Sequence, residues 1–253
     1  MTVDRSLYET AYETLPDWPC PTCGKGHLKS AEDALLDRES GPSKAAQVDP
    51  GWDPEWISKR FAGLLTCNFG NCGEVVAILG DMHVTEEHDY DEDGQPQQEY
   101  VEWFEPRSLS PAPLPFRPPA DTPKLVQAAL QEAAGLLWQS AEGAANQVRQ
   151  AVEYLMDEQG VTKSLPGAYI PLHNRIKEFE VQDAKNAELL FAVKWLGNSG
   201  SHAGDLTRED VLDAFDFVEI VLDNLYDTTT AELIAKAKAI NLNKGPVKPP
   251  EFI

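Results

Sequence analysis

Basic residues are scarce in this sequence. The 253 residues contain 21 Lys and Arg against 42 Asp and Glu, which gives a formal net charge of −21. Residues 1–106 carry 22 of the acids and 7 of the bases, a balance of −15, and the remaining residues carry −6. Contacts to a phosphate backbone need many Lys and Arg side chains. The composition therefore argues against broad binding to a DNA backbone, while leaving room for a small local cationic site.

Long apolar runs are also missing. No stretch approaches the ~20 apolar residues that cross a bilayer, and the first residues, Met1 to Tyr8, contain no apolar secretory core. We therefore expect a soluble, cytoplasmic protein without a membrane partner. Hydrophobic residues make up 42% of the chain, which is enough to bury a core in one large domain or two small ones.

Cysteine is rare too, and its few positions are informative. The four cysteines form two pairs, each followed at once by a glycine: Cys20 and Cys23, then Cys67 and Cys72. Glycine permits a tight turn whose backbone amides point at the sulfurs, and four thiolates suit a structural, tetrahedral Zn²⁺ ion. Two disulfides or a redox-active Cys-x-x-Cys are the alternatives. Three histidines in this half, at positions 27, 83 and 88, are weaker candidates because four cysteines already complete the shell.

The residues around the second cysteine pair have strand character. The segments 61–66, 74–79 and 100–105 are rich in apolar and β-branched residues and flank an acidic loop at 88–94. Three strands and two cysteine turns predict a zinc ribbon. The long segment between the pairs is expected to be an insertion with a short helix near Ala31–Arg38.

Prolines then mark a boundary. Seven of them lie between positions 106 and 123, which disfavours helix and suits an extended connector. Beyond it, apolar residues recur at helical spacing, with Thr122 and Thr207 as predicted N-caps and a second helix expected from about Ser140 to Gln159. We expect an α+β protein with a zinc-ribbon domain at 1–106, a linker at 107–122, an antiparallel four-helix bundle at 123–240 and a flexible tail at 241–253.

Three segments resemble a known family. They are Trp18-Pro-Cys-Pro-Thr-Cys-Gly, Ala144-Ala-Asn-Gln-Val-Arg-Gln-Ala-Val-Glu-Tyr-Leu and Leu196-Gly-Asn-Ser-Gly-Ser-His-Ala-Gly, and they are similar to the prokaryotic domain-of-unknown-function family 4145. The resemblance implies a HEPN-like helical domain, often a homodimer, of a kind found in restriction, toxin–antitoxin and other antiviral defence systems. Many HEPN proteins are metal-independent ribonucleases with an arginine four to six residues before a histidine.

The candidate site departs from that family pattern. The positions that would hold the arginine are Trp195, Leu196 and Gly197, and the nearest cation on that segment is Lys194. The candidate catalytic residues are therefore His202, Asn198, Lys194 and Arg149. Three of the four have a structural alternative: a capping or buried histidine for His202, a C-cap or turn for Asn198, and a salt bridge to Glu153 for Arg149.

These observations leave different classes of function open. The first is an interaction or regulatory component that docks a protein partner or a second copy through the helical bundle, with structural Zn²⁺ as its cofactor. The second is an endoribonuclease that uses His202, for which RNA is the partner. A sequence-specific nucleic-acid reader is a third possibility, against which the acidity of the ribbon half counts.

Overall fold

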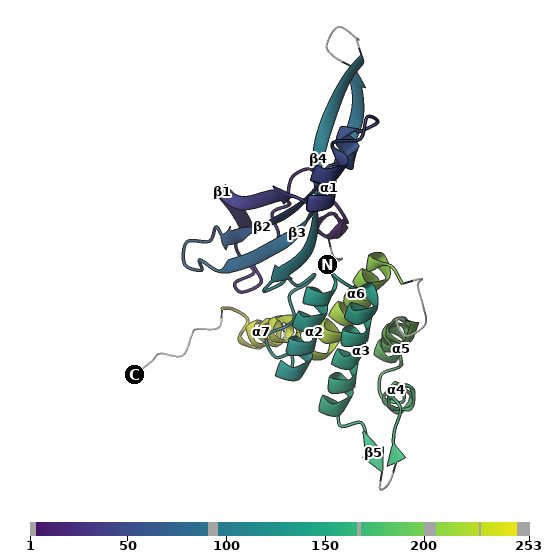
Figure 1. Ribbon diagram of the computed structural model, residues 1–253. Helices are drawn as coiled ribbons and strands as arrows, with labels where there is room; N and C mark the ends of the chain where they lie inside the picture. The colour runs from purple at the N-terminus through teal and green to yellow at the C-terminus, as the bar shows by residue number, and fades with distance from the viewer. Residues whose placement is uncertain (1–3, 91–95, 166–167, 200–205, 228, 247–253) are drawn as a thin grey trace.

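A computed structural model describes residues 4–90, 96–165, 168–199, 206–227 and 229–246. Its ribbon shows a β-sheet at one end and a group of helices at the other, with the N-terminal segment between them (Figure 1). The predicted α+β class is therefore confirmed in its coarse form. None of the described helices is both long enough and apolar enough to span a membrane.

The sheet is an antiparallel meander of four strands in the order β1-β2-β3-β4. Alternation along β2 explains which side is buried: Phe61, Leu65 and Cys67 point into the core, while Ala62 and Leu64 point outward. The hairpin of β3 and β4 projects beyond the other two strands (Figure 1). The strands are β1 Leu28–Glu39, β2 Ser58–Cys67, β3 Val75–Tyr90 and β4 Pro96–Ser110.

The helix expected at Ala31–Arg38 is wrong, because this segment belongs to strand β1. Its residues favour a helix locally, but β1 pairs antiparallel with β2 from Leu28 opposite Cys67 to Glu39 opposite Lys59. The register shifts between Ser30 and Leu35. Pairing with a distant strand outweighs local propensity here. The short helix lies further along the chain, where Ser40 caps α1, Gly41–Ala46, and the 3₁₀ turn η2, Pro54–Trp56, follows.

Strands β3 and β4 are longer than the sequence predicts. They pair from Ala77 opposite Ser110 to Tyr90 opposite Pro96, so the connecting acidic loop is shorter than residues 88–94. The strand β4 also passes position 106 and enters the predicted linker. Pro106 is tolerated within it because β4 is the edge strand of the sheet. The outer side of β4 meets Tyr12 through an isolated bridge at Phe104, so the missing N–H of Pro106 need not face a neighbouring strand.

The helical half agrees well with the sequence pattern. Ser140 caps α3, Thr207 caps α6 in a capping box with Asp210, and Gly160 ends α3 at φ +72°. The first helix begins at Lys124 with Pro123 as its N-cap, one residue later than expected. The helices are α2 Lys124–Leu136, α3 Ala141–Glu158, α4 Leu172–Glu180, α5 Ala184–Ser199, α6 Arg208–Tyr226 and α7 Thr229–Asn243.

Helix α3 lies at the centre of the helical half. It packs against α2, α4, α5 and α6, so five helices rather than four make up the packed group, and α7 packs along none of them. The buried residues of α3 recur at helical spacing, and they are Ala144, Ala145, Val148, Ala151, Val152, Leu155 and Met156. A short two-stranded sheet, β5 Ser164–Leu165 and β6 Ala168–Tyr169, joins α3 to α4.

The two halves share one core. Trp18, from the segment before the first cysteine, packs edge-on against Trp138, with ring centroids 5.6 Å apart. Tyr8, in the 3₁₀ turn η1 (Arg5–Tyr8), lies 5.7 Å from the same indole. Arg208 at the start of α6 donates hydrogen bonds to the carbonyls of Tyr8 and Glu9, at 3.1 and 2.7 Å. The N-terminal segment thus binds the sheet to the helices.

Candidate metal centre

The first cysteine pair sits on a closed turn before β1. The Cys20 amide donates to the Gly26 carbonyl at 2.9 Å, and the Gly24 amide donates back to the Cys20 carbonyl at 3.0 Å. Gly24 has φ +58°, a left-handed conformation that favours glycine. Two further amides, of Lys25 and Gly26, lie 3.4 and 3.5 Å from the Cys23 Sγ. This is the geometry in which backbone N–H groups stabilise a thiolate.

The second pair closes the β2–β3 turn in a similar way. The Cys67 amide donates to the Glu74 carbonyl and the Cys72 amide to the Phe69 carbonyl, both at 2.8 Å. The Phe69 amide lies 3.4 Å from the Cys67 Sγ, and Gly73 has φ +66°. Both glycines that follow the cysteine pairs therefore have the positive φ that the sequence predicts for them.

The two turns are joined directly. The His27 amide donates to the Asn68 Oδ1 at 2.9 Å, and the Asn68 amide donates to the His27 carbonyl at 3.0 Å. Gly26 lies so close to the second turn that a Cβ there would be 2.6 Å from the Cys67 Sγ. These contacts place the two cysteine pairs opposite one another.

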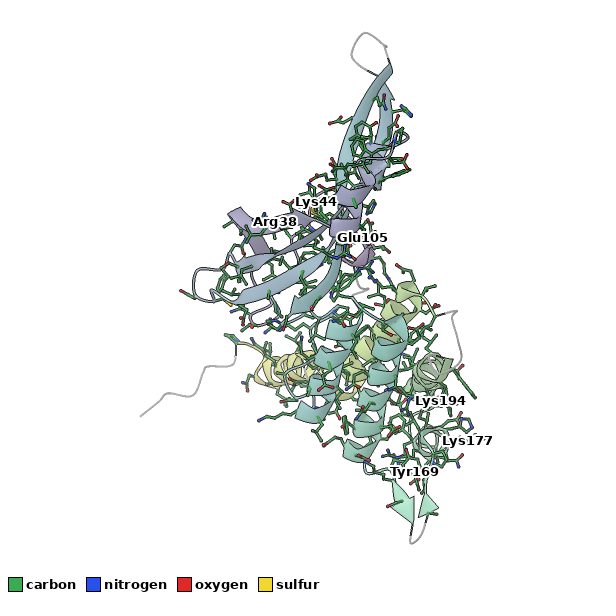
Figure 2. All side chains as sticks on the ribbon, in the orientation of Figure 1. Arg38, Lys44, Glu105, Tyr169, Lys177 and Lys194 are labelled. Carbon is green, nitrogen blue, oxygen red and sulfur yellow. The ribbon has the colours of Figure 1, made fainter. Side chains whose placement is uncertain are left out.

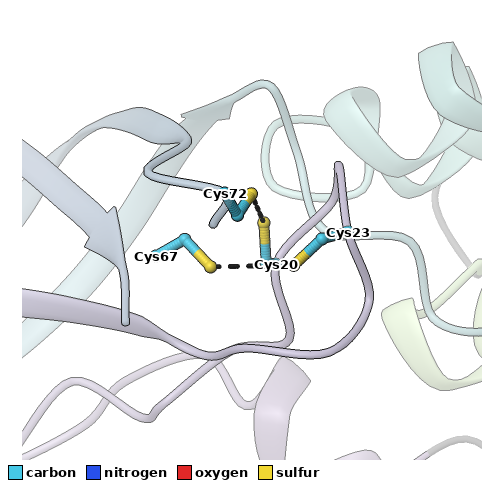
Figure 3. A group of neighbouring side chains, drawn as sticks. All are labelled: Cys20, Cys23, Cys67 and Cys72. Carbon is cyan, nitrogen blue, oxygen red and sulfur yellow. Dashed lines mark hydrogen bonds between the residues drawn. The ribbon is translucent and has the colours of Figure 1, made fainter. Parts of the chain in front are cut away.

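All four thiols converge on one point (Figure 3). The sulfurs of Cys20 and Cys72 are 3.8 Å apart, those of Cys23 and Cys67 are 3.7 Å apart, and all four lie within 4.8 Å of one another. These separations far exceed the ~2.05 Å of a disulfide, and the cysteines are free thiols. The predicted grouping of four cysteines is found, and the group is compatible with a bound metal ion.

The electrostatics of the thiols differ. Hydrogen bonds from the amides of Gly26 and Lys25 lower the pKa of Cys23 to about 6, whereas burial raises the pKa of Cys67 to about 12. A bound cation would favour the thiolate form of every member. Two of the candidate histidines lie elsewhere, where His83 pairs with Glu105 and His88 with Glu86, each at 3.1 Å. His27 lies between the two cysteine turns, but it is exposed and does not belong to the group of four converging ligands.

The helical candidates are arranged around the contact of α3 with α5. Arg149 donates to Glu153 at 2.5 Å, which confirms the predicted i, i+4 salt bridge. Gly197 faces it so closely that a Cβ there would be 2.6 Å from the Arg149 Cβ and 3.0 Å from the Ala145 carbonyl oxygen. Glycine is therefore required at position 197 by the approach of two helices, and Arg149 lies against the signature segment.

Of the two remaining helical candidates that the structure describes, Lys194 is the less accessible to a ligand. Lys194 is only 7% exposed, and its Nζ lies 3.0 Å from the centroid of the Trp195 ring, a cation–π contact. Burial lowers the pKa of this amine. Asn198 is an exposed residue within the last turn of α5, which continues through Gly197 to Ser199. His202 lies outside the described residues.

Sequence reasoning missed the contacts that hold the two turns in place. The His27–Asn68 pair spans 41 residues, and Arg117 of the proline-rich segment donates to the Cys23 carbonyl at 3.2 Å across 94 residues. No local pattern marks such pairs, since each residue is an ordinary surface type. The one available signal was the density of cysteine and glycine near both turns.

Comparison with known families divides the chain in the same way as the fold. Residues 9–109 match the model of a domain of unknown function, DUF8608, which covers the four cysteines and the sheet. Residues 131–243 match that of another domain of unknown function, DUF4145, from α2 to the end of α7. No curated protein and no solved structure matches the chain. The helical half of this chain, residues 131–243, is therefore a member of the domain-of-unknown-function family 4145, as the segment from Leu196 to Gly204 indicates.

Proposed function

We propose that this protein is a zinc-stabilised interaction module, in which a structural Zn²⁺ ion fixes the sheet and a partner protein docks on the sheet's outer face. The donor set supports zinc. Four thiolates at about 2.3 Å from a tetrahedral ion are about 3.8 Å from one another, and the sulfurs of Cys20 and Cys72 are 3.8 Å apart. Four protein ligands leave no open position for a substrate, so the ion's role is structural.

The observation that carries the docking role is the apolar outer face of the sheet. Leu36, Leu64 and Leu79 are 66%, 55% and 51% exposed. They share this face because Ala62 is paired with both Leu36 and Leu79, and Leu64 with Ala77. Exposed apolar side chains that are contiguous across three strands are uncommon on a free surface and typical of a protein interface.

Charge at the edge of this face indicates the kind of partner. Arg38 and Arg60 are paired across β1 and β2 beside the apolar residues, and Arg107 lies near them. Asp81 forms ion pairs with Arg60 at 3.1 Å and with Arg107 at 3.0 Å, and Glu105 pairs with Arg107 at 3.0 Å. Arg38, labelled with Glu105 in Figure 2, has no carboxylate partner among the described residues. A net positive edge on a chain of charge −21 is complementary to an apolar partner surface bordered by carboxylates.

The sheet-face role predicts a specific mutational result. Changing Leu64→Lys and Leu79→Lys together is expected to weaken partner binding at least tenfold, because two cations would replace apolar contacts at the centre of the face. The folding midpoint should change by less than ~2 °C, since both side chains are exposed. Val181→Lys, at an apolar residue beyond α4 that is 88% exposed, is the control away from the sheet.

The measurement needs a defined partner. Mass spectrometry would identify the host proteins that the wild type captures. Candidate partners are those that the double variant fails to capture and the control variant still captures. Each would then be purified and its affinity measured again by calorimetry. Equal affinity for wild type and the double variant would remove the outer face from the proposal.

A ribonuclease is the second candidate, and one contact favours it. Arg149 packs against Gly197, so a cation from α3 lies beside the segment that leads to His202. Against it, Arg149 is held by Glu153 and Lys194 is buried on Trp195, which leaves neither free to neutralise a phosphorane. We therefore favour the non-catalytic module.

The nuclease alternative has a direct test. We expect purified protein to leave a labelled single-stranded RNA intact without added metal, and the His202→Ala variant to behave identically. Cleavage products that depend on His202 would instead establish the enzyme. An Arg149→Ala variant would then show whether this arginine supplies the cation, by a rate loss of about 10²-fold or more.

The proposal also covers the domain types, the oligomeric state and the biological system of this protein. The zinc-ribbon and HEPN-like bundle descriptions, a homodimer and a place in an antiviral defence or toxin–antitoxin system all follow from the family resemblance. Four free thiols agree with a reducing compartment such as the cytoplasm. The identity of neighbouring genes tests the setting, and light scattering of the purified chain tests the dimer.

A further inference from the structure

A groove lies beside the metal centre and includes Cys20 in its lining. It has a volume of about 810 Å³ and three walls: the first cysteine turn, the proline-rich segment 114–120 and the first turns of α2. A groove of this size is typical of a ligand site. The bond from Arg117 to the Cys23 carbonyl joins two of its walls, so the metal centre stiffens the groove.

The charge of the groove is opposite to that of the protein. None of the described residues that line it is acidic, and two of them, Arg117 and Lys124, are cations. Neither has a carboxylate within ion-pair distance in the described part of the chain. Three acidic residues, Asp121, Asp223 and Asp227, line a separate cavity of about 330 Å³ that Arg117 also borders. The aminoterminal end of α2, which has no side-chain cap, adds to the positive potential.

The lining also restricts the kind of ligand. Five of the sixteen lining residues are prolines, which carry a carbonyl but no N–H donor. The amides of Gln127 and Gln131 are already bonded to the carbonyls of Thr122 and Ala112, at 2.7 and 2.6 Å. Arg117 and Lys124 are therefore the main side-chain donors left in the lining. An extended peptide can donate its own N–H groups to the wall carbonyls and place apolar side chains on the proline rings.

We propose that this groove binds an extended segment of a partner protein in which apolar residues alternate with carboxylates. The apolar side chains lie against the prolines, and the carboxylates pair with Arg117 and Lys124. The proposal rests on the interaction role proposed above and gives it a second contact, separate from the outer face of the sheet. Charge complementarity selects an acidic segment over a basic one.

The test uses two synthetic peptides and the full, zinc-loaded chain. One has the sequence Leu-Pro-Glu-Leu-Pro-Glu-Leu with blocked ends, and the other has lysine in place of both glutamates. Calorimetry is expected to show at least tenfold tighter binding of the acidic peptide. The variant with Arg117→Glu and Lys124→Glu should lose this preference or reverse it.

Controls separate charge from folding. Lys177→Glu with Lys185→Glu makes the same change of charge on α4 and α5, away from the groove, and should leave the preference intact. Lys124→Glu alone avoids the Cys23 contact and should lower acidic-peptide affinity several-fold with an unchanged zinc content. The sheet-face variant Leu64→Lys with Leu79→Lys should bind the acidic peptide as the wild type does, whether or not that face docks a partner. Equal affinity for both peptides, or an acidic preference that survives the groove variant, would overturn the proposal.

Discussion

Replacing Cys67 by serine is expected to remove the bound metal and to melt the sheet half. Cys67 is buried and carries the end of β2, so its loss breaks the centre where both cysteine turns meet. Loss of a structural metal belongs to the few single changes that cost about 4–5 kcal/mol or more, which lowers the melting temperature by roughly 10–20 °C for a chain of this size. Metal analysis and circular dichroism measure the two effects.

A chelator experiment distinguishes the effect of losing the metal from the effect of changing the Cys67 side chain. A strong chelator added to the wild type should reproduce the low melting temperature, because metal binding and folding are coupled. Thr66→Ser, at the exposed neighbouring position, should bind a full equivalent of zinc and melt as the wild type does. Wild-type protein isolated without chelator that holds well below one equivalent of zinc would contradict the metal centre.

Changing Trp138→Ala is expected to destabilise both halves at once. Its indole is 1% exposed and packs between Trp18 and Tyr8, while the Arg208 guanidinium lies 5.3 Å from the ring centroid. Its Nε1 has no hydrogen-bond partner in the part of the chain that the structure describes, so the loss is one of packing, about 3–5 kcal/mol for a large aromatic side chain. Urea unfolding followed by circular dichroism measures it.

The position of Trp138 predicts more than a loss of stability. Because it links the N-terminal segment to α2, its removal should uncouple the halves and split unfolding into two transitions. Trp56→Ala, at an indole that is 48% exposed, should change the free energy of unfolding by less than about 0.5 kcal/mol. A single transition of unchanged midpoint in Trp138→Ala would show that the shared core does not hold the halves together.

Local chemistry explains what could be predicted. The cysteine turns need a glycine after each pair, and Gly24 and Gly73 have the required positive φ. The ends of α3 and α6 follow from Ser140 and Thr207, because a cap is a contact between residues three apart. Where contacts between residues close in sequence decide the local structure, the sequence predicts that structure correctly.

Segment 31–38 shows where that reasoning fails. Its alanine, glutamate and leucine residues favour a helix, yet it is a strand because the cysteine turns align it with β2. The same applies to Arg149 and Gly197, which are 48 positions apart and in contact only because α3 crosses close to α5. The sequence around either residue does not predict its contact with the other.

The sequence by itself determined the four cysteines that could hold a metal ion, the positions of most helices and the family of the helical half. Each of these depends on spacing within a few residues or on a short motif. The tertiary structure alone decided that β1 is a strand, that Trp18 meets Trp138, that an apolar face stays uncovered and that a cationic groove forms in an acidic protein. These features depend on which distant segments become neighbours, and that choice is made by the burial of the whole core rather than by any local preference.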